Sequence, residues 1–367
     1  MFNFRKKNFF KIDIILIITI LMLTLLGLIV LNSASLSLSY NPIKSQVIAS
    51  ILGVFVSIII ISLDYDFIKN LNKIVYIISL LLMVLVTLFG KGEEIWGANN
   101  WLVLGPIQFQ PSEFVKIGMI ISFARSLEDN RKNISKPLVL LKVLTPQLIL
   151  IALIAKEDFG TAFVTTFIIA VMLFSAGLNI FYFVGIIASG ILSLPIIYNF
   201  LDGYQKDRIK NFLDPSRDIA GTGFQAMQGK IAIGSGKLTG RGLYKGIQTQ
   251  NNFIPEKQTD YIFPVLAEEL GFIGSSLLIA LYTNMLYRFV KISENAKDPY
   301  GSYLVMGIAS MFLIHIFENI GMTIGIMPVT GIPLPFMSHG GTFQLINFIA
   351  IGLVLNVNIE RQKLDFN

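Results

Sequence analysis

The sequence predicts an all-α polytopic membrane protein with about ten transmembrane helices and one long external loop between helices 7 and 8. The 367 residues are 54% hydrophobic and only 14% charged, whereas a soluble domain has roughly 45–50% apolar and about 25% charged residues. The mean hydropathy is +0.68. Apolar stretches recur along the whole chain, and basic residues are distributed unevenly between the segments that join them. These observations indicate a bilayer protein.

Ten apolar stretches are long enough to cross a membrane. A helix rises 1.5 Å per residue, so about 20 residues span a hydrocarbon core of about 30 Å. The first stretch follows a basic segment and is too long for the apolar core of a signal peptide, so we interpret it as a retained anchor. Ten spans place both termini on one side. The stretches lie near residues 12–31, 46–63, 74–90, 112–127, 138–155, 161–177, 180–199, 264–289, 302–325 and 343–359.

Lysine and arginine residues predict the orientation of the bundle. With a cytoplasmic N-terminus, sixteen basic residues lie in cytoplasmic segments and four in or beside the short external ones, and an excess of Lys and Arg marks the cytoplasmic side. We therefore expect a multi-pass protein of the cytoplasmic (inner) membrane with both termini cytoplasmic. The cytoplasmic set is Arg5, Lys6, Lys7, Lys11, Lys69, Lys73, Arg125, Arg131, Lys132, Lys136, Lys142, Arg288, Lys291, Lys297, Arg361 and Lys363; the external set is Lys44, Lys91, Lys116 and Lys156.

The long loop is the one soluble-sized feature of the chain. We expect residues 1–367 to form a single transmembrane domain, with residues 200–263 as an extracytoplasmic loop, because long loops translocate regardless of their charge. Within it, the segment from Tyr204 to Leu213 places apolar and basic residues at near-helical spacing. This pattern predicts an amphipathic helix at the membrane surface. A solvated basic loop is the alternative.

Composition limits the chemistry. The chain has no cysteine, and its two histidines, His315 and His339, make a poor metal-binding set. The formal charge of +6 is explained by membrane topology and attraction to anionic lipid, so we expect no nucleic-acid partner. Catalysis must then come from carboxylates, Lys or Arg side chains and the backbone.

Two segments place ionisable residues at the ends of apolar spans, where such residues are costly and often functional. Glu113 and Lys116 lie three residues apart behind Pro111, which suits the first turn of a helix. They can form a structural ion pair near the membrane surface, or Lys116 can meet an anionic ligand in a substrate cavity. Asp260 lies where the polar loop enters the eighth span, a setting that can raise the pKa of a carboxyl toward the range of a general base.

For Asp260 a structural interpretation remains open at this stage, because Thr259 and Asp260 are equally suited to cap a helix N-terminus. Glu268 and Glu269 follow, and at least one should face the bundle interior. A third segment, residues 327–342, carries three prolines and three glycines before the last span. Its irregular backbone could line a wet cavity, with Ser338 and the amides of Gly340 and Gly341 facing an anion, or could form a simple external turn.

Together these segments resemble the SEDS family (shape, elongation, division and sporulation), whose branches include RodA, FtsW and SpoVE. Gln248-Thr249-Gln250 with Phe253 favours the RodA branch. Three departures stand out: Asn99 and Asn100 occupy the places of two family arginines, Gln258 that of a His and His339 that of a Tyr. The resembling residues are Gly97 to Trp101, Gly105, Phe109 to Glu113, Lys116, Asp158 to Thr161, Arg208, Phe212 to Pro215, Gly223, Gln225, Gln228, Ile231 to Gly236, Gln248 to Gln250, Phe253, Pro255, Glu256, Thr259, Asp260, Glu268 to Gly271 and Pro328 to Gly341.

The resemblance implies a peptidoglycan glycosyltransferase that polymerises lipid II into a β-1,4 glycan by one inverting displacement from undecaprenyl pyrophosphate. It makes Asp260 the catalytic carboxylate and implies a class B penicillin-binding protein transpeptidase and elongation complex proteins as partners. No dedicated metal cage is visible, and Mg²⁺ shared with the substrate phosphates is an optional cofactor. A lipid II flippase and a non-catalytic scaffold are the alternatives. The implied substrate-binding residues are Trp101, Glu113, Lys116, Arg208, Ser338, Gly340 and Gly341.

Overall fold

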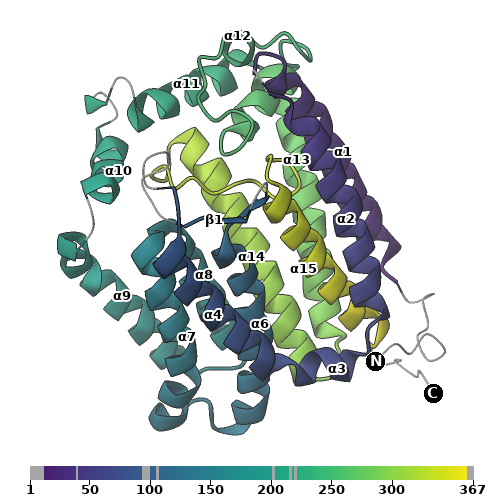
Figure 1. The fold of residues 1–367 in the computed structure, drawn as a ribbon, viewed down its shortest axis with the longest axis vertical. Helices are drawn as coiled ribbons and strands as arrows, with labels where there is room; N and C mark the ends of the chain where they lie inside the picture. Colours follow the sequence, from purple (N-terminus) through teal and green to yellow (C-terminus); the bar gives the residue numbers. More distant parts are fainter. Residues whose placement is uncertain are drawn as a thin grey trace.

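The computed structural model describes residues 12–38, 40–92, 100–104, 107–200, 203–214, 217–218 and 221–361. Ten long helices coincide with the ten predicted spans and form one bundle (Figure 1). They are α1 (Ile14–Ser35), α2 (Pro42–Ser62), α4 (Asn72–Phe89), α6 (Pro111–Asn130), α7 (Pro137–Glu157), α8 (Phe159–Ser175), α9 (Ile180–Phe200), α13 (Ile262–Glu294), α14 (Pro299–Ile324) and α15 (Gly341–Ile359).

Shorter elements join these helices. They are α3 (Tyr65–Asn70), the antiparallel strands β1 (Leu102–Leu104) and β2 (Ile107–Phe109), the 3-10 helix η2 (Arg131–Asn133), and the loop helices α10 (Gly203–Leu213), α11 (Thr222–Ser235) and α12 (Ile247–Gln250). In the described part of the chain, seven helices are long and apolar enough to cross a membrane, and α8 is a shorter apolar helix. The chain is therefore a multi-pass helical membrane protein, as predicted, although the β1–β2 hairpin was not expected.

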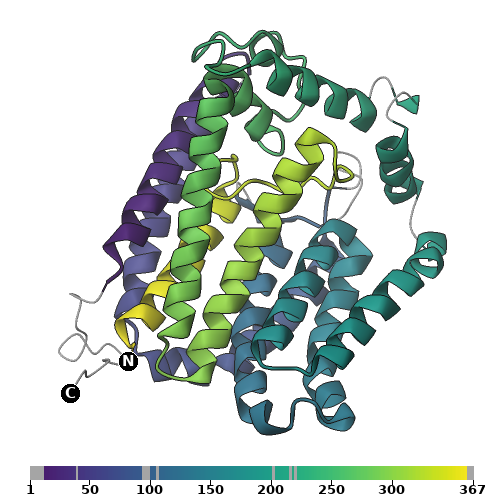
Figure 2. The same cartoon turned by 180° about the vertical axis from the view of Figure 1, so that it is seen from behind.

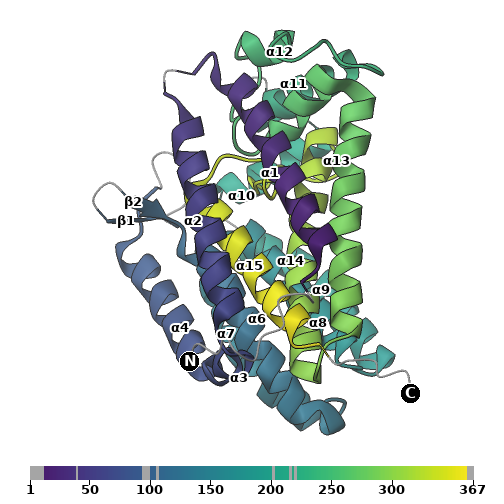
Figure 3. The ribbon, with the colours of Figure 1, turned by 90° about the vertical axis from the view of Figure 1, so that its right-hand side faces the viewer.

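The start of α1 and the end of α15 lie at the same end of the bundle (Figures 1 and 3). An even number of spans requires this arrangement. The loop helices α11 and α12 cover the opposite end, and α10 stands at the side of that end (Figures 1 and 2). Of the basic residues that predict the orientation, Arg5, Lys6, Lys7, Lys11 and Lys363 lie outside the described residues.

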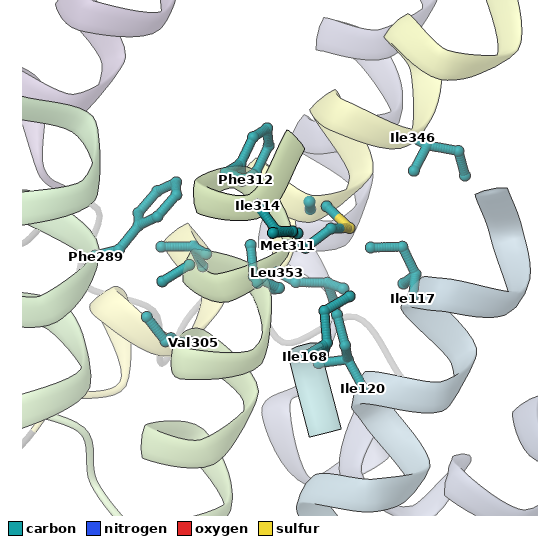
Figure 4. Close-up of a cluster of buried hydrophobic side chains, with 14 of the residues drawn as sticks. Ile117, Ile120, Ile168, Phe289, Val305, Met311, Phe312, Ile314, Ile346 and Leu353 are labelled. Carbon is teal, nitrogen blue, oxygen red and sulfur yellow. The ribbon is translucent and has the colours of Figure 1, made fainter. Parts of the chain in front are cut away.

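The centre of the bundle is apolar and surrounds α14. Figure 4 shows Ile117 of α6, Ile168 of α8, Phe289 of α13 and Leu353 of α15 converging on this helix. Helices in a bilayer gain no hydrophobic driving force from contacting one another, so close packing at small residues is important. Gly53 of α2 supplies such a contact, since a Cβ there would stand 2.5 Å from the Phe348 ring on α15.

The loop is built into the bundle through α13. Gly271 interrupts this helix with φ +65°. The amide of Phe272 donates to the carbonyl of Lys237 at 2.9 Å, and the amide of Arg241 donates to the carbonyl of Glu268 at 2.9 Å. The loop therefore satisfies backbone groups that the break in α13 opens.

Glu268 and Glu269 are both buried, which confirms that at least one faces the interior. Glu268 accepts hydrogen bonds from the amide of Thr249 at 3.0 Å and from its hydroxyl at 2.8 Å. Glu269 accepts one from the Ser33 hydroxyl of α1 at 2.6 Å. Because each carboxylate has polar partners, both can be buried, and they fix α12 and α1 against the start of α13.

Candidate active site

Asp260 lies in the turn that precedes α13. The N-cap of that helix is Tyr261 and no side chain caps it, so the capping alternative for Asp260 and Thr259 is wrong. The main chain of the turn is held on both sides. Asn319 Nδ2 of α14 donates to the carbonyl of Asp260 at 2.9 Å, and Ser338 Oγ donates to the carbonyl of Thr259 at 2.5 Å. The turn is thus fixed through its backbone, and capping does not occupy the Asp260 carboxyl.

Three segments distant in sequence meet beside Gly331. Asp260 Oδ2 lies 3.4 Å, and Arg208 Nη2 3.8 Å, from the place that a Cβ on Gly331 would take. Arg208 Nη1 donates to the carbonyl of Thr330 at 2.9 Å. Gly331 has φ +78°, a conformation that favours glycine. The absence of a side chain at this position therefore lets a cation and the Asp260 carboxylate share one small space.

The environment of Asp260 makes its carboxyl a weaker acid than an ordinary aspartate. Burial, the largest cause, raises the pKa of its carboxyl to about 7, and the negative charges of Glu256 and Asp158 act in the same direction. Arg208 opposes them and lowers the pKa. A carboxyl with a pKa near neutrality is suited to accept a proton at physiological pH.

Arg208 is brought to the site by α10, so the prediction of a helix from Tyr204 to Leu213 is confirmed. Ile209 and Phe212 of this helix are half-buried. Its placement at the membrane surface stays a prediction. Pro215, which follows the helix in the family pattern, lies outside the described residues.

The loop between α14 and α15 supports the Asp260 turn from behind. Ser338 is fully buried, and its Oγ accepts from the amide of Leu334 at 2.8 Å while donating to Thr259. The amide of Gly340 donates to Gln46 Oε1 of α2 at 3.0 Å. Only Gly341 of the three predicted anion-binding residues is exposed. This geometry favours a positioning role for Ser338 and Gly340.

Glu113 and Lys116 form a buried ion pair in the opening turns of α6. Lys116 Nζ lies 2.8 Å from Glu113 Oε1 and 2.8 Å from His315 Nε2 of α14. The Lys116 side chain is 1% exposed, so it does not extend to the membrane surface. In this structure the ammonium faces protein partners, and the geometry favours the ion-pair interpretation over direct contact with an anionic ligand.

Trp101 stands at the base of the β1–β2 hairpin and is half-buried. Its backbone exchanges hydrogen bonds with Lys91 at 2.9 and 3.2 Å. The hairpin reaches the start of α15, where the Thr342 hydroxyl donates to the carbonyl of Gln108 at 3.4 Å. A substrate contact for Trp101 stays a prediction. The neighbouring motif residues Gly97, Ala98, Asn99 and Gly105 lie outside the described residues.

Two residues of α14 were missed by the sequence interpretation. Asn319 is fully buried and links the carbonyl of Asp260 to that of Ile332, at 2.9 and 2.7 Å. Glu318 is 1% exposed and interacts electrostatically with Lys116 and Asp158. The signal for Glu318 was present, because a carboxylate inside the apolar stretch 302–325 is costly and therefore informative.

Residues 13–363 match the family described as cell cycle protein, FtsW/RodA/SpoVE. This chain belongs to that family, the SEDS family. The match includes the Asp260 turn, α10 and the loop before α15, so the segments that converge at the site are family segments.

Curated SEDS relatives cover most of the chain. It is 36% identical over 361 residues to stage V sporulation protein E of Bacillus subtilis, covering 94% of this chain and 96% of the relative. It is 37% identical over 297 residues to the peptidoglycan glycosyltransferase MrdB of Escherichia coli, covering 79% and 78%.

Solved structures agree with this assignment. RodA of Thermus thermophilus superposes with a TM-score of 0.70 at 26% identity, covering 98% of this chain and 99% of that one. A chain from a structure entitled "Structural coordination of polymerization and crosslinking by a peptidoglycan synthase complex" gives a TM-score of 0.82 at 29% identity, covering 96% and 99%.

Proposed function

We propose that this chain is a peptidoglycan glycosyltransferase that polymerises lipid II into β-1,4 glycan strands at the outer face of the cytoplasmic membrane during cell elongation. The observation that carries the proposal is the Asp260 carboxyl, whose pKa of about 7 fits a general base and which lies beside the Arg208 guanidinium. The name of the Escherichia coli relative, peptidoglycan glycosyltransferase MrdB, supports this class of reaction.

In the proposed step Asp260 takes the proton of the 4-hydroxyl on the GlcNAc of the acceptor. The freed oxygen forms a bond with the anomeric carbon of the donor MurNAc. The bond from that carbon to pyrophosphate breaks, and the electron pair leaves with undecaprenyl pyrophosphate. An α-linked donor gives a β-linked product, so one inverting displacement is sufficient. Arg208 stabilises the negative charge that develops on the leaving group, and Asp260 then releases its proton to water.

The remaining predicted residues support this step in different ways. We propose Trp101 and Gly341 as substrate contacts, because both are accessible to solvent. Ser338 and Gly340 hold the polypeptide around Asp260, as their hydrogen bonds indicate. Glu113 and Lys116 keep α6 and α14 in register below the site.

A divalent cation fits the site only in part. Among the described residues, no group of three or more His, Asp or Glu side chains could hold a metal ion. Mg²⁺ commonly binds one or two carboxylates together with substrate phosphates. Glu256, whose charge acts on Asp260, is the carboxylate that could contribute, and the ion would supply charge stabilisation for the leaving pyrophosphate.

We propose a class B penicillin-binding protein transpeptidase as the partner, within a complex of elongation proteins. The structural similarity to a chain of a peptidoglycan synthase complex supports this proposal. The test of function is an electrophoretic assay of purified protein with lipid II, alone and with a candidate partner. Glycan strands in either reaction are the expected result. Transfer of lipid II across vesicle membranes without polymer would instead identify a flippase. The absence of both polymerisation and transfer would identify a scaffold.

The orientation can be tested by cysteine labelling, since the chain has no cysteine of its own. Lys245→Cys lies in the exposed loop, and Lys132→Cys lies in η2 at the other end of the bundle. Because basic residues predict cytoplasmic termini, a membrane-impermeant maleimide should label Lys245→Cys in intact cells and Lys132→Cys only after permeabilisation. The reverse pattern would overturn the proposed external site.

A further inference from the structure

A small pocket lies between α10, α11 and the end of α14, next to the Asp260 site. Two cationic side chains line it, Arg208 from α10 and Lys230 from α11, and no acidic side chain is among the described residues that line it. Met322 and Met327 contribute apolar surface. The pocket thus combines positive charge with an apolar wall, and Arg208 belongs both to this pocket and to the space beside Asp260.

Lys230 of α11 lies in the wall of this pocket. Its side chain is exposed, and within the described part of the chain it makes no hydrogen bond or ion pair. Its ammonium rests on the backbone of Gly325, 2.2 Å from the place that a Cβ there would take. Gly325 ends α14 in the left-handed conformation, with φ +81°. A glycine at this position therefore leaves room for a lysine ammonium at the pocket wall.

The neutral polar side chains that line the pocket, Asn211 and Thr222, hydrogen-bond to protein groups. Asn211 Nδ2 donates to Asp218 Oδ2 at 2.9 Å and to Thr222 Oγ1 at 2.9 Å. Lys116, the other cation considered for anion binding, is buried between Glu113 and His315. An anion near Asp260 consequently meets Arg208 and Lys230 first.

We propose that this pocket binds the pyrophosphate of the prenyl-linked donor, with Lys230 as the second cation beside Arg208 and the methionines against the first prenyl units. This inference rests on the proposed function. In an inverting displacement the leaving oxygen and the attacking oxygen lie on opposite sides of one carbon. The leaving pyrophosphate must therefore lie close to the base. Arg208 lies beside Asp260 and also lines the pocket, so the pocket is close enough to Asp260 to hold the pyrophosphate.

Binding of undecaprenyl pyrophosphate to the purified full-length protein tests the proposal. Loss of a hydrogen bond to a charged group weakens binding by about 10-fold or more, so Lys230→Gln should lower the affinity by that factor and raise KM for lipid II. Lys230→Arg, which keeps the charge, should restore most of the affinity. Lys245→Gln removes an exposed lysine of the same loop that does not line the pocket, and it should bind like the wild type.

Competition experiments with related compounds identify the ligand. Inorganic pyrophosphate and phosphatidylglycerol vesicles should each compete weakly, because they lack either the prenyl chain or the pyrophosphate. If Lys230→Gln and Lys245→Gln weakened binding of undecaprenyl pyrophosphate equally, the proposed pyrophosphate site would be contradicted. It would also be contradicted if phosphatidylglycerol bound tightly to the wild type and this binding were lost in Lys230→Gln. Asp260→Asn should bind undecaprenyl pyrophosphate like the wild type while making glycan about 10²–10⁴-fold more slowly. A failure of the catalytic proposal is thereby distinguished from a failure of the pocket.

Discussion

Replacing Asp260 by asparagine is expected to lower the rate of glycan synthesis by about 10²–10⁴-fold, the usual contribution of a positioned general base. Asparagine keeps the size of the side chain but accepts no proton at neutral pH. Stability should be unchanged, because Asp260 caps no helix and Asn319 binds its backbone carbonyl rather than its side chain. Polymer formed from lipid II and the midpoint of thermal unfolding should be measured on the same preparations.

Two controls sharpen this prediction. Asp207→Asn changes an exposed carboxylate on α10 that pairs with Lys210, and it should retain near-wild-type activity. Asp260 works deprotonated and its pKa is about 7, so the wild-type rate should fall about tenfold per pH unit below pH 7. The residual activity of Asp260→Asn should lack this acid limb. Normal polymerisation by folded Asp260→Asn would rule out the assignment.

Replacing Lys116 by methionine is expected to destabilise the protein by about 3–5 kcal/mol, because removal of one partner leaves a buried charge uncompensated. Glu113 loses its cation in this variant, and the membrane interior offers no water to replace it. The double variant Glu113→Gln/Lys116→Met should recover most of the stability, since both charges are then removed. Thermal unfolding in detergent measures the difference.

Lys73→Met is the matched control, because Lys73 is exposed on α4 and makes no ion pair among the described residues. Polymerisation by the double variant decides the role of Lys116. Recovery of activity together with stability confirms a positioning role. A stable but inactive double variant contradicts the positioning role and supports direct contact between Lys116 and the substrate.

The helices were predictable because hydrophobic length is a strong signal. Each of the ten spans was placed to within a few residues at most ends, although α13 extends beyond its predicted end at residue 289 to Glu294. The polar final turns of such a helix carry no hydropathy signal. The β1–β2 hairpin was missed because strands of three residues are too short to show alternation.

The sequence predicted which residues form the site better than it predicted how they are arranged. Asp260 and Arg208 were both identified, but their approach depends on Gly331, and no local pattern shows that three such distant segments meet. The same limit explains the buried triad of Glu113, Lys116 and His315, where the sequence could suggest only the first two as a pair. Contacts between helices are set by tertiary packing, which periodicity does not encode.

The break in α13 at Gly271 ties the order of the helix to the order of the loop. A helix that opens in the membrane needs partners for its free backbone groups at once, and here they come from residues 237–242. A Cβ on Gly240 would stand 2.1 Å from the carbonyl of Glu269, so the fit leaves no space for a side chain. The loop segment 237–242 and the break in α13 therefore depend on each other, because each supplies the backbone partners that the other lacks.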